Sequence, residues 1–231
     1  MNDKKAERVI DTFTGPLERK ILCKLANALP EKVLPDHLTV LAFVGTLISA
    51  AAYLLSAQSR CWLFLASFGF VLNWFGDSLD GTLARVRHIE RERYGYFVDH
   101  LADALTTVII CLSFGLSPLM RFDIAMMIAI GYLLMNVYVH VSAYTQGEFR
   151  ISYKNFAPTE IRLAIILFNT VMFFWDGQVL EYRGDQLTIM DLGGLVFSLA
   201  FVVIFIVSFI NTALKLDKLD RAKKRDEGKQ E

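Results

Sequence analysis

Long stretches without a charged residue limit what this chain can fold into. A transmembrane helix needs about 20 predominantly apolar residues, with a usual minimum of about 17. The composition agrees, because 54% of the 231 residues are hydrophobic, a high share for a soluble domain of this length. We therefore expect an all-α integral membrane protein with six transmembrane helices. The six uncharged runs are 38–59, 61–76, 104–120, 124–147, 163–175 and 192–214.

Four of these runs reach or nearly reach the length of a bilayer span, whereas the second and the fifth are shorter. The second is expected to continue through Asp77 and Asp80, because buried acids are tolerated in a membrane where they face a polar cavity. The fifth is expected to begin near Pro158, with Glu160 and Arg162 at its interfacial end.

Lysine and arginine are distributed unevenly among the segments that connect the predicted spans. Of the 24 such residues, 21 lie in the N-terminal segment, the second and fourth connections and the C-terminal tail. Cytoplasmic segments of membrane proteins carry this excess. We therefore predict that both termini lie in the cytoplasm and that the acidic residues described below open to that side. In a bacterium the membrane would be the cytoplasmic membrane.

The segments outside the predicted spans are short and polar. Within residues 1–37, an apolar residue recurs at every fourth position from Leu17 to Leu29, which predicts an interfacial amphipathic helix, resting on lipid or packed on the bundle. The same segment lacks the apolar core of a signal peptide. Residues 215–231 form a polar cytoplasmic tail, which we expect to be disordered from 217 onward. The membrane domain is then 38–214.

Four aspartates lie between the second and third apolar runs, in two groups. Members of the first group fall within roughly 140° of one another on an α-helix and so share one face. They are Asp77, Asp80, Gly81, Ala84 and Arg85. Members of the second group recur at every fourth position and form one stripe on a second helix. They are Gly95, Asp99 and Asp103.

Two helices with such faces could bring four carboxylates to one point. Clustered carboxylates repel one another and need compensating positive charge, which a divalent metal supplies most simply. Oxygen ligands without Cys or His at ligand spacing favour Mg²⁺, Mn²⁺ or Ca²⁺ over zinc, and a pair of ions with a phosphate between them suits this set. The structural alternative is a salt-bridge cluster of the acids with Arg85 and its neighbouring arginines.

These residues at these offsets resemble the signature of the CDP-alcohol phosphotransferase family, whose members make phospholipids in membranes. The match comprises Asp77, Asp80, Gly81, Ala84, Arg85, Gly95, Asp99 and Asp103. A second match is the run Pro35-Asp36-His37-Leu38-Thr39, which resembles the Pro-x-x-Leu-Thr segment that family members carry before their first membrane helix.

The resemblance implies a reaction and a role for each group of residues. Two divalent ions, Mg²⁺ or Mn²⁺, would be held by the four aspartates Asp77, Asp80, Asp99 and Asp103, with Asp103 also acting as the catalytic general base. The CDP-alcohol would contact Thr39, Asp77, Gly81, Arg85 and Gly95. Family members are generally homodimers, so we expect one here, with membrane lipids as further partners and no nucleic acid.

The acceptor pocket is expected to use cationic residues of the fourth connection and the start of the fifth span, namely Arg150, Lys154 and Arg162. Their charge would suit a phosphorylated acceptor such as glycerol phosphate or an inositol phosphate. The same charges also fit a role in membrane topology alone.

Several functions remain compatible with the sequence. We favour transfer of a phosphatidyl group from CDP-diacylglycerol to a small polar alcohol, with release of CMP. His100 after Asp99 resembles the branch of the family that transfers choline or ethanolamine phosphate to diacylglycerol. Intramembrane acids also mark transporters and ion pathways, although Gly81, Arg85 and Gly95 argue against that class. A structural membrane subunit without activity is the remaining alternative.

Overall fold

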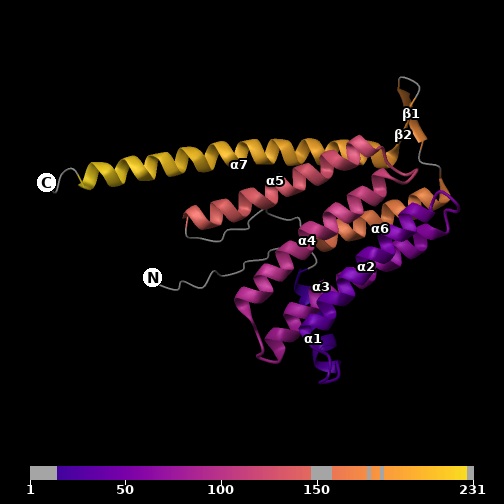
Figure 1. Ribbon diagram of the computed structural model, residues 1–231, viewed down its shortest axis with the longest axis horizontal. Helices are drawn as coiled ribbons and strands as arrows, with labels where there is room; N and C mark the ends of the chain where they lie inside the picture. Colours follow the sequence, from indigo (N-terminus) through magenta and orange to yellow (C-terminus); the bar gives the residue numbers. More distant parts are fainter. Residues whose placement is uncertain (1–14, 147–157, 176–177, 183–184, 228–231) are drawn as a thin grey trace.

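The computed structural model describes residues 15–146, 158–175, 178–182 and 185–227. This part is mostly helical, with one two-stranded antiparallel hairpin before the last helix (Figure 1). The helices are α1 (Gly15–Ala28), α2 (Pro35–Leu55), α3 (Trp62–Val86), α4 (Glu92–Gly115), α5 (Phe122–Gln146), α6 (Pro158–Phe174) and α7 (Ile189–Glu227), and the strands are β1 (Gln178–Tyr182) and β2 (Asp185–Thr188).

Glycines bring the backbones of α2 and α3 into direct contact. A Cβ atom on Gly45 would lie 2.6 Å from the backbone nitrogen of Asn73 and 2.6 Å from the carbonyl oxygen of Gly69. A Cβ on Gly76 would lie 2.6 Å from the backbone nitrogen of Ala42. Small residues at such positions let membrane helices approach closely. This contact fixes how α2 and α3 sit relative to each other.

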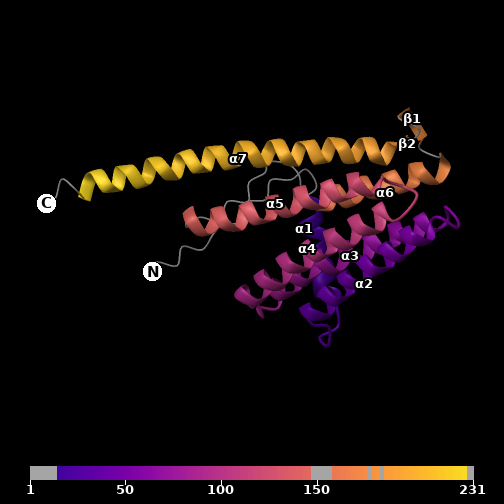
Figure 2. The ribbon, with the colours of Figure 1, turned by 45° about the horizontal axis from the view of Figure 1, so that its top comes forward.

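The other long helices build on the α2–α3 pair. Helix α4 packs on α2, α5 on α4 and α7 on α5, while α6 packs on α3 (Figures 1 and 2). A buried apolar core joins α2, α3, α4, α5 and α6 near the end where the chain turns from α4 into α5. It includes Tyr53, Phe70, Phe114, Ile124 and Met172.

The first helix packs on the bundle and crosses the direction of the long helices (Figure 2). Its buried Leu22 and Ala26 contact Leu38, Leu79 and Leu83 in a second apolar cluster. Of the two arrangements considered for the amphipathic helix, the structure therefore contains the one packed on protein. Contact of its other face with lipid stays a prediction.

Six helices, α2 to α7, correspond to the six predicted spans, and four of them are long and apolar enough to cross a membrane. Among the residues that the structure describes, these four are Pro35–Leu55, Glu92–Gly115, Phe122–Thr145 and Ile189–Ala222. As expected, α3 continues through the aspartates and α6 begins at Pro158. Helix α3 carries Asp77 and Asp80, and α6 has only 17 residues, so neither belongs to these four. That α3 and α6 cross the membrane stays a prediction.

The expectation of a disordered tail from 217 is wrong as far as Glu227. Helix α7 runs for 39 residues, about 58 Å at the α-helical rise, and ends beyond the neighbouring α5 (Figure 1). Charge suggested disorder, but residues 214–227 contain neither Gly nor Pro, and Arg221 pairs with Asp217 one turn away at 2.9 Å. Good helix formers and i,i+4 pairs support a helix without a packed core.

Candidate active site

All four aspartates line one small cavity between α2, α3 and α4. Asp77 and Asp80 come from α3, and Asp99 and Asp103 come from α4. The cavity volume is about 20 Å³, space for about one water molecule. The helical faces predicted from spacing therefore do meet.

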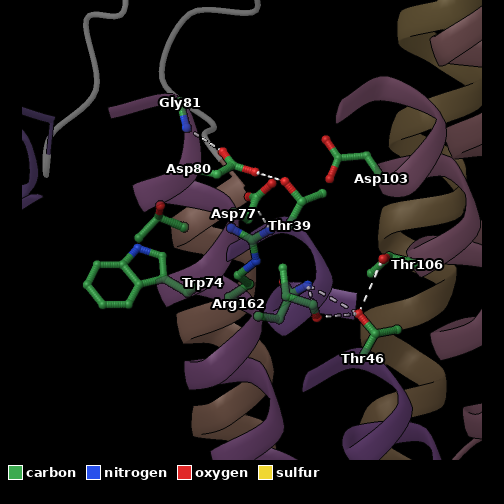
Figure 3. Close-up of polar contacts among 12 residues, drawn as sticks. Thr39, Thr46, Trp74, Asp77, Asp80, Gly81, Asp103, Thr106 and Arg162 are labelled. Atoms are coloured by element: carbon green, nitrogen blue, oxygen red, sulfur yellow. Dashed lines mark hydrogen bonds and ion pairs between the residues drawn. The ribbon is translucent and has the colours of Figure 1, made fainter. Parts of the chain in front are cut away.

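Thr39 and Gly81 hold the carboxylate of Asp80 (Figure 3). The Thr39 hydroxyl donates a hydrogen bond of 2.6 Å to Asp80 Oδ2, and the backbone N–H of Gly81 donates to Oδ1. Thr39 lies in the second turn of α2, which Pro35 opens, a favourable position for proline at a helix start. The Pro-x-x-Leu-Thr segment therefore contributes directly to the acidic cluster.

Arg162 reaches the cluster from α6. Its Nη2 atom donates to Asp77 Oδ2 at 2.7 Å, and the residue is only 9% exposed. Sequence reasoning proposed Arg162 as an acceptor contact but missed this ion pair. The available signal was an arginine near the start of an apolar helix, because a charge there needs a partner. Arg150 and Lys154, the other proposed acceptor contacts, lie outside the described residues.

The two aspartates on α4 differ in their surroundings. The side chain of Asp99 is 37% exposed, and Asp103 interacts electrostatically with the other three aspartates and with Arg162. Figure 3 shows the Asp103 carboxylate on the opposite side of the cluster from Gly81. Asp103 thus interacts with every charged member of the cluster, although it stands apart from Gly81.

His100 belongs to a separate polar and aromatic group. Its Nδ1 atom is 2.8 Å from the carbonyl oxygen of Tyr96 and 3.8 Å from Asp99 Oδ2. Its ring centroid is 5.0 Å from that of His140, whose Nδ1 is 2.9 Å from the hydroxyl of Tyr96. These contacts give His100 a packing role between α4 and α5.

A polar network centred on Asn73 lines the cavity beside the acids. Asn73 Nδ2 donates to Thr46 Oγ1 at 3.1 Å and to the carbonyl oxygen of Ala42 at 3.1 Å. The hydroxyls of Thr46 and Thr106 are 3.2 Å apart (Figure 3). Threonines inside apolar helices carry no distinctive sequence signal, because they also bond to their own backbone.

The two glycines of the motif have different surroundings. A Cβ on Gly81 would lie 3.4 Å from Arg85 Nη1, and Arg85 Nη2 donates to Thr82 Oγ1 at 3.2 Å. A Cβ on Gly95 would meet nothing within 4 Å. The structure therefore places Arg85 beside Gly81 and leaves open space at Gly95.

The residues at the cavity fit a hard divalent cation by their donor chemistry. Its charged lining residues are the four aspartates, and one guanidinium, that of Arg162, pairs with them. Carboxylate oxygens are the ligands that Mg²⁺ and Mn²⁺ prefer. Across the described ranges, no group of three or more His, Cys, Asp or Glu residues is arranged to hold a metal.

Comparison with known proteins agrees with the motif. The sequence profile of the CDP-alcohol phosphatidyltransferase family matches residues 32–206. The chain belongs to this family. The match covers every residue of the acidic cavity and leaves out α1 and the end of α7.

This member of the CDP-alcohol phosphatidyltransferase family is similar to parts of two known proteins. The chain is 30% identical over 123 residues to "Archaetidylinositol phosphate synthase" of Pyrococcus horikoshii, covering 52% of this chain and 59% of that protein. It is 34% identical over 87 residues to "Bifunctional IPC transferase and DIPP synthase" of Thermococcus kodakarensis, covering 38% of this chain and 18% of that protein. The chain thus matches only part of each relative.

Proposed function

We propose that this protein transfers a phosphatidyl group from CDP-diacylglycerol, or the equivalent group from an ether-lipid counterpart, to the hydroxyl of a small polar alcohol and releases CMP. The observation that carries the proposal is the meeting of four aspartates, Thr39 and Arg162 around one cavity in a helical membrane protein of this family.

Asp77, Asp80, Asp99 and Asp103 would hold two divalent ions, Mg²⁺ or Mn²⁺. Such ions would neutralise charge on the pyrophosphate of the donor and on the leaving CMP. The role of Thr39 and Gly81 would be to orient Asp80, because both donate hydrogen bonds to its carboxylate. Orientation of a ligand by a hydrogen-bonded neighbour commonly decides metal affinity.

Asp103 would act as the general base. It accepts the proton of the acceptor hydroxyl while the hydroxyl oxygen attacks the phosphorus distal to cytidine. The bond from that phosphorus to the oxygen of CMP breaks, and CMP leaves. A carboxylate suits this role when it is held close to the reacting hydroxyl, and Asp103 lines the cavity together with the other three aspartates.

The nucleotide would lie outside the cavity, because about 20 Å³ holds little more than a water molecule. The exposed side chain of Asp99 and the open space at Gly95 leave room for it. Gly81 and Arg85, which lie side by side on α3, would contact it together with Thr39.

The acceptor is proposed to be a phosphorylated polyol, and an inositol phosphate is the first to test. Arg162 is buried beside the acids and carries the charge that such a phosphate needs, and Arg150 and Lys154 would add to it. The name of the Pyrococcus horikoshii relative describes a product that contains inositol phosphate. We further propose six membrane crossings, a cavity facing the cytoplasm and a homodimer.

The proposal is tested by measuring CMP release from the purified protein in detergent with Mg²⁺. The donors are CDP-diacylglycerol and its ether-lipid counterpart, and the acceptors are serine, glycerol phosphate, inositol and inositol phosphate. We expect acceptor-dependent CMP release with one acceptor, and a loss of about 10²–10⁴-fold in Asp103→Asn, the usual contribution of a general base. Binding of the CDP-alcohol should be largely spared in that variant.

A matched control is Asp123→Asn, because Asp123 is an exposed acid at the start of α5 that pairs with Arg121. It should leave CMP release unchanged. Activity with CDP-choline or CDP-ethanolamine plus diacylglycerol, and none with the first panel, would reverse the choice of donor. Movement of a labelled solute across vesicles without CMP release would instead assign a transporter.

A further inference from the structure

Glu18 on α1 joins two other helices through one carboxylate oxygen. Its Oε1 atom accepts a hydrogen bond of 2.8 Å from the indole N–H of Trp74 on α3 and one of 2.9 Å from the hydroxyl of Thr159 on α6. Hydrogen bonds to an ionised acceptor are the stronger kind. The residue lies outside the range that matches the family, 32–206, so the family motif gives it no role.

Both partners of Glu18 lie one helical turn from the ion pair at the cavity. Trp74 precedes Asp77 by three residues, and Thr159 precedes Arg162 by three residues. Residues three apart on a helix are neighbours on one face. Glu18 therefore links α3 and α6 directly beside the point where Arg162 meets Asp77.

Another polar contact between α3 and α6 lies farther along the helices. Asn169 Nδ2 donates to Ser67 Oγ at 3.1 Å, and Ser67 precedes Asp77 by about 15 Å along the α3 axis. Near the cavity, the start of α6 is held to α3 by the Glu18 bridge and by the ion pair of Arg162 with Asp77.

Glu18 is itself fixed in place, because α1 is anchored by buried apolar contacts. Leu22 and Ala26, on the next turns of α1, pack against Leu38, Leu79 and Leu83. A carboxylate on an anchored helix can hold its two donors at a constant separation. Catalytic and binding groups that shift by about 1 Å can lose about 10²-fold in rate.

We propose that Glu18 is a positioning residue, which holds the first turn of α6 against α3 so that the guanidinium of Arg162 lies at Asp77. Anion binding at the cavity then depends on the two hydrogen bonds that Glu18 accepts. The consequence for the acceptor rests on the proposed function, whereas the coupling between Glu18 and Arg162 does not.

The first test is a double-mutant cycle on stability, measured by thermal unfolding of the full chain in detergent. The variants are Glu18→Ala, Arg162→Met and the two combined. Residues that share no direct contact usually show additive effects. We expect instead that the melting temperature falls clearly less in the double variant than the decreases of the two single variants added together. The control cycle replaces Glu18→Ala by Leu22→Ala, which weakens α1 packing without touching α6, and it should be additive.

The second test is the KM for the acceptor in the CMP-release assay. Glu18→Ala should raise this KM by about tenfold, the factor expected for hydrogen bonds of ordinary net strength, with a much smaller change in kcat. Glu18→Gln should recover most of the effect, because the amide oxygen can accept both hydrogen bonds. Thr159→Val keeps the side-chain shape, removes the donor on α6 and should raise the KM likewise, so it replaces Glu18→Ala if that variant does not fold.

Additive losses in the Glu18 and Arg162 cycle would overturn the proposal. So would a KM increase in Leu22→Ala as large as that in Glu18→Ala, because the effect would then be one of general α1 packing. If the wild type releases no CMP with any donor, the proposed function fails and the stability cycle still decides the role of Glu18.

Discussion

The contact between α2 and α3 makes a specific prediction for Gly76→Ala. A Cβ at this position would lie 2.6 Å from the backbone nitrogen of Ala42 and 2.9 Å from its Cβ, where ordinary contact begins at 3.4 Å. The carbonyl oxygen of Leu38 lies closer still, so the two helices would have to separate by at least the difference between 3.4 and 2.6 Å, which is 0.8 Å. Backbone atoms cannot turn aside as a flexible side chain can, so we expect α3 to move.

The movement affects the acidic cluster because Gly76 adjoins Asp77. A full 0.8 Å shift would lengthen the 2.6 Å hydrogen bond from Thr39 to Asp80 to a separation at which it is weak. Overpacking costs about 1–3 kcal/mol, and a lost hydrogen bond to a charged group costs about 1.5–3 kcal/mol. The better helix propensity of alanine returns about 1 kcal/mol. We expect a net loss of about 1.5–5 kcal/mol in the free energy of unfolding.

The assay is denaturant unfolding in detergent, followed by circular dichroism, together with CMP release. Gly95→Ala is the matched control, since its Cβ would meet nothing within 4 Å. It should leave the free energy of unfolding unchanged or raise it by up to about 1 kcal/mol, while CMP release falls because the space proposed for the nucleotide is reduced. Equal stability of Gly76→Ala and wild type, or a large destabilisation by Gly95→Ala, would refute the reasoning.

Three further predictions concern the cation, a loop and the far end of the bundle. Removal of divalent cations with EDTA should abolish CMP release without unfolding, and Mg²⁺ or Mn²⁺ should restore it; full activity in EDTA would contradict a metal role. Arg87→Lys should lower the free energy of unfolding by about 1–2 kcal/mol, measured in denaturant, because the guanidinium donates to four backbone carbonyls of residues 29–33. Asp191→Ala should lower the free energy of unfolding by about 3 kcal/mol or more in the same assay. The buried carboxylate accepts hydrogen bonds from the N–H and hydroxyl of Thr188 and from the N–H of Arg121. A variant as stable as the wild type would show that water replaces the carboxylate.

Local patterns in the sequence determined which segments are helical and which face of each helix carries the aspartates. Uncharged runs placed α2 to α7, and spacings of three and four residues placed Asp77 with Asp80 and Asp99 with Asp103 on common faces. The motif pointed to the family that the comparison shows. These features depend on neighbours within one or two turns, so a single sequence contains them.

The same local reasoning failed where two signals competed. The charged end of α7 suggested disorder, yet its residues are good helix formers and continue the helix to Glu227. Regular spacing also predicted which face of each helix carries the aspartates, but not the distances between their carboxylates. Among the described residues, no group of three or more acids, histidines or cysteines is arranged to hold a metal ion.

The tertiary structure alone decided which side chains meet between helices. Thr39 bonds Asp80 across 41 residues of sequence, Arg162 reaches Asp77 across 85, and Thr159 reaches Glu18 across 141. Each pairing depends on the angle at which the helices cross and on their register. For α2 and α3, close packing at Gly45, Gly69 and Gly76 sets both. Crossing and register result from the fit of whole surfaces, which no local pattern specifies.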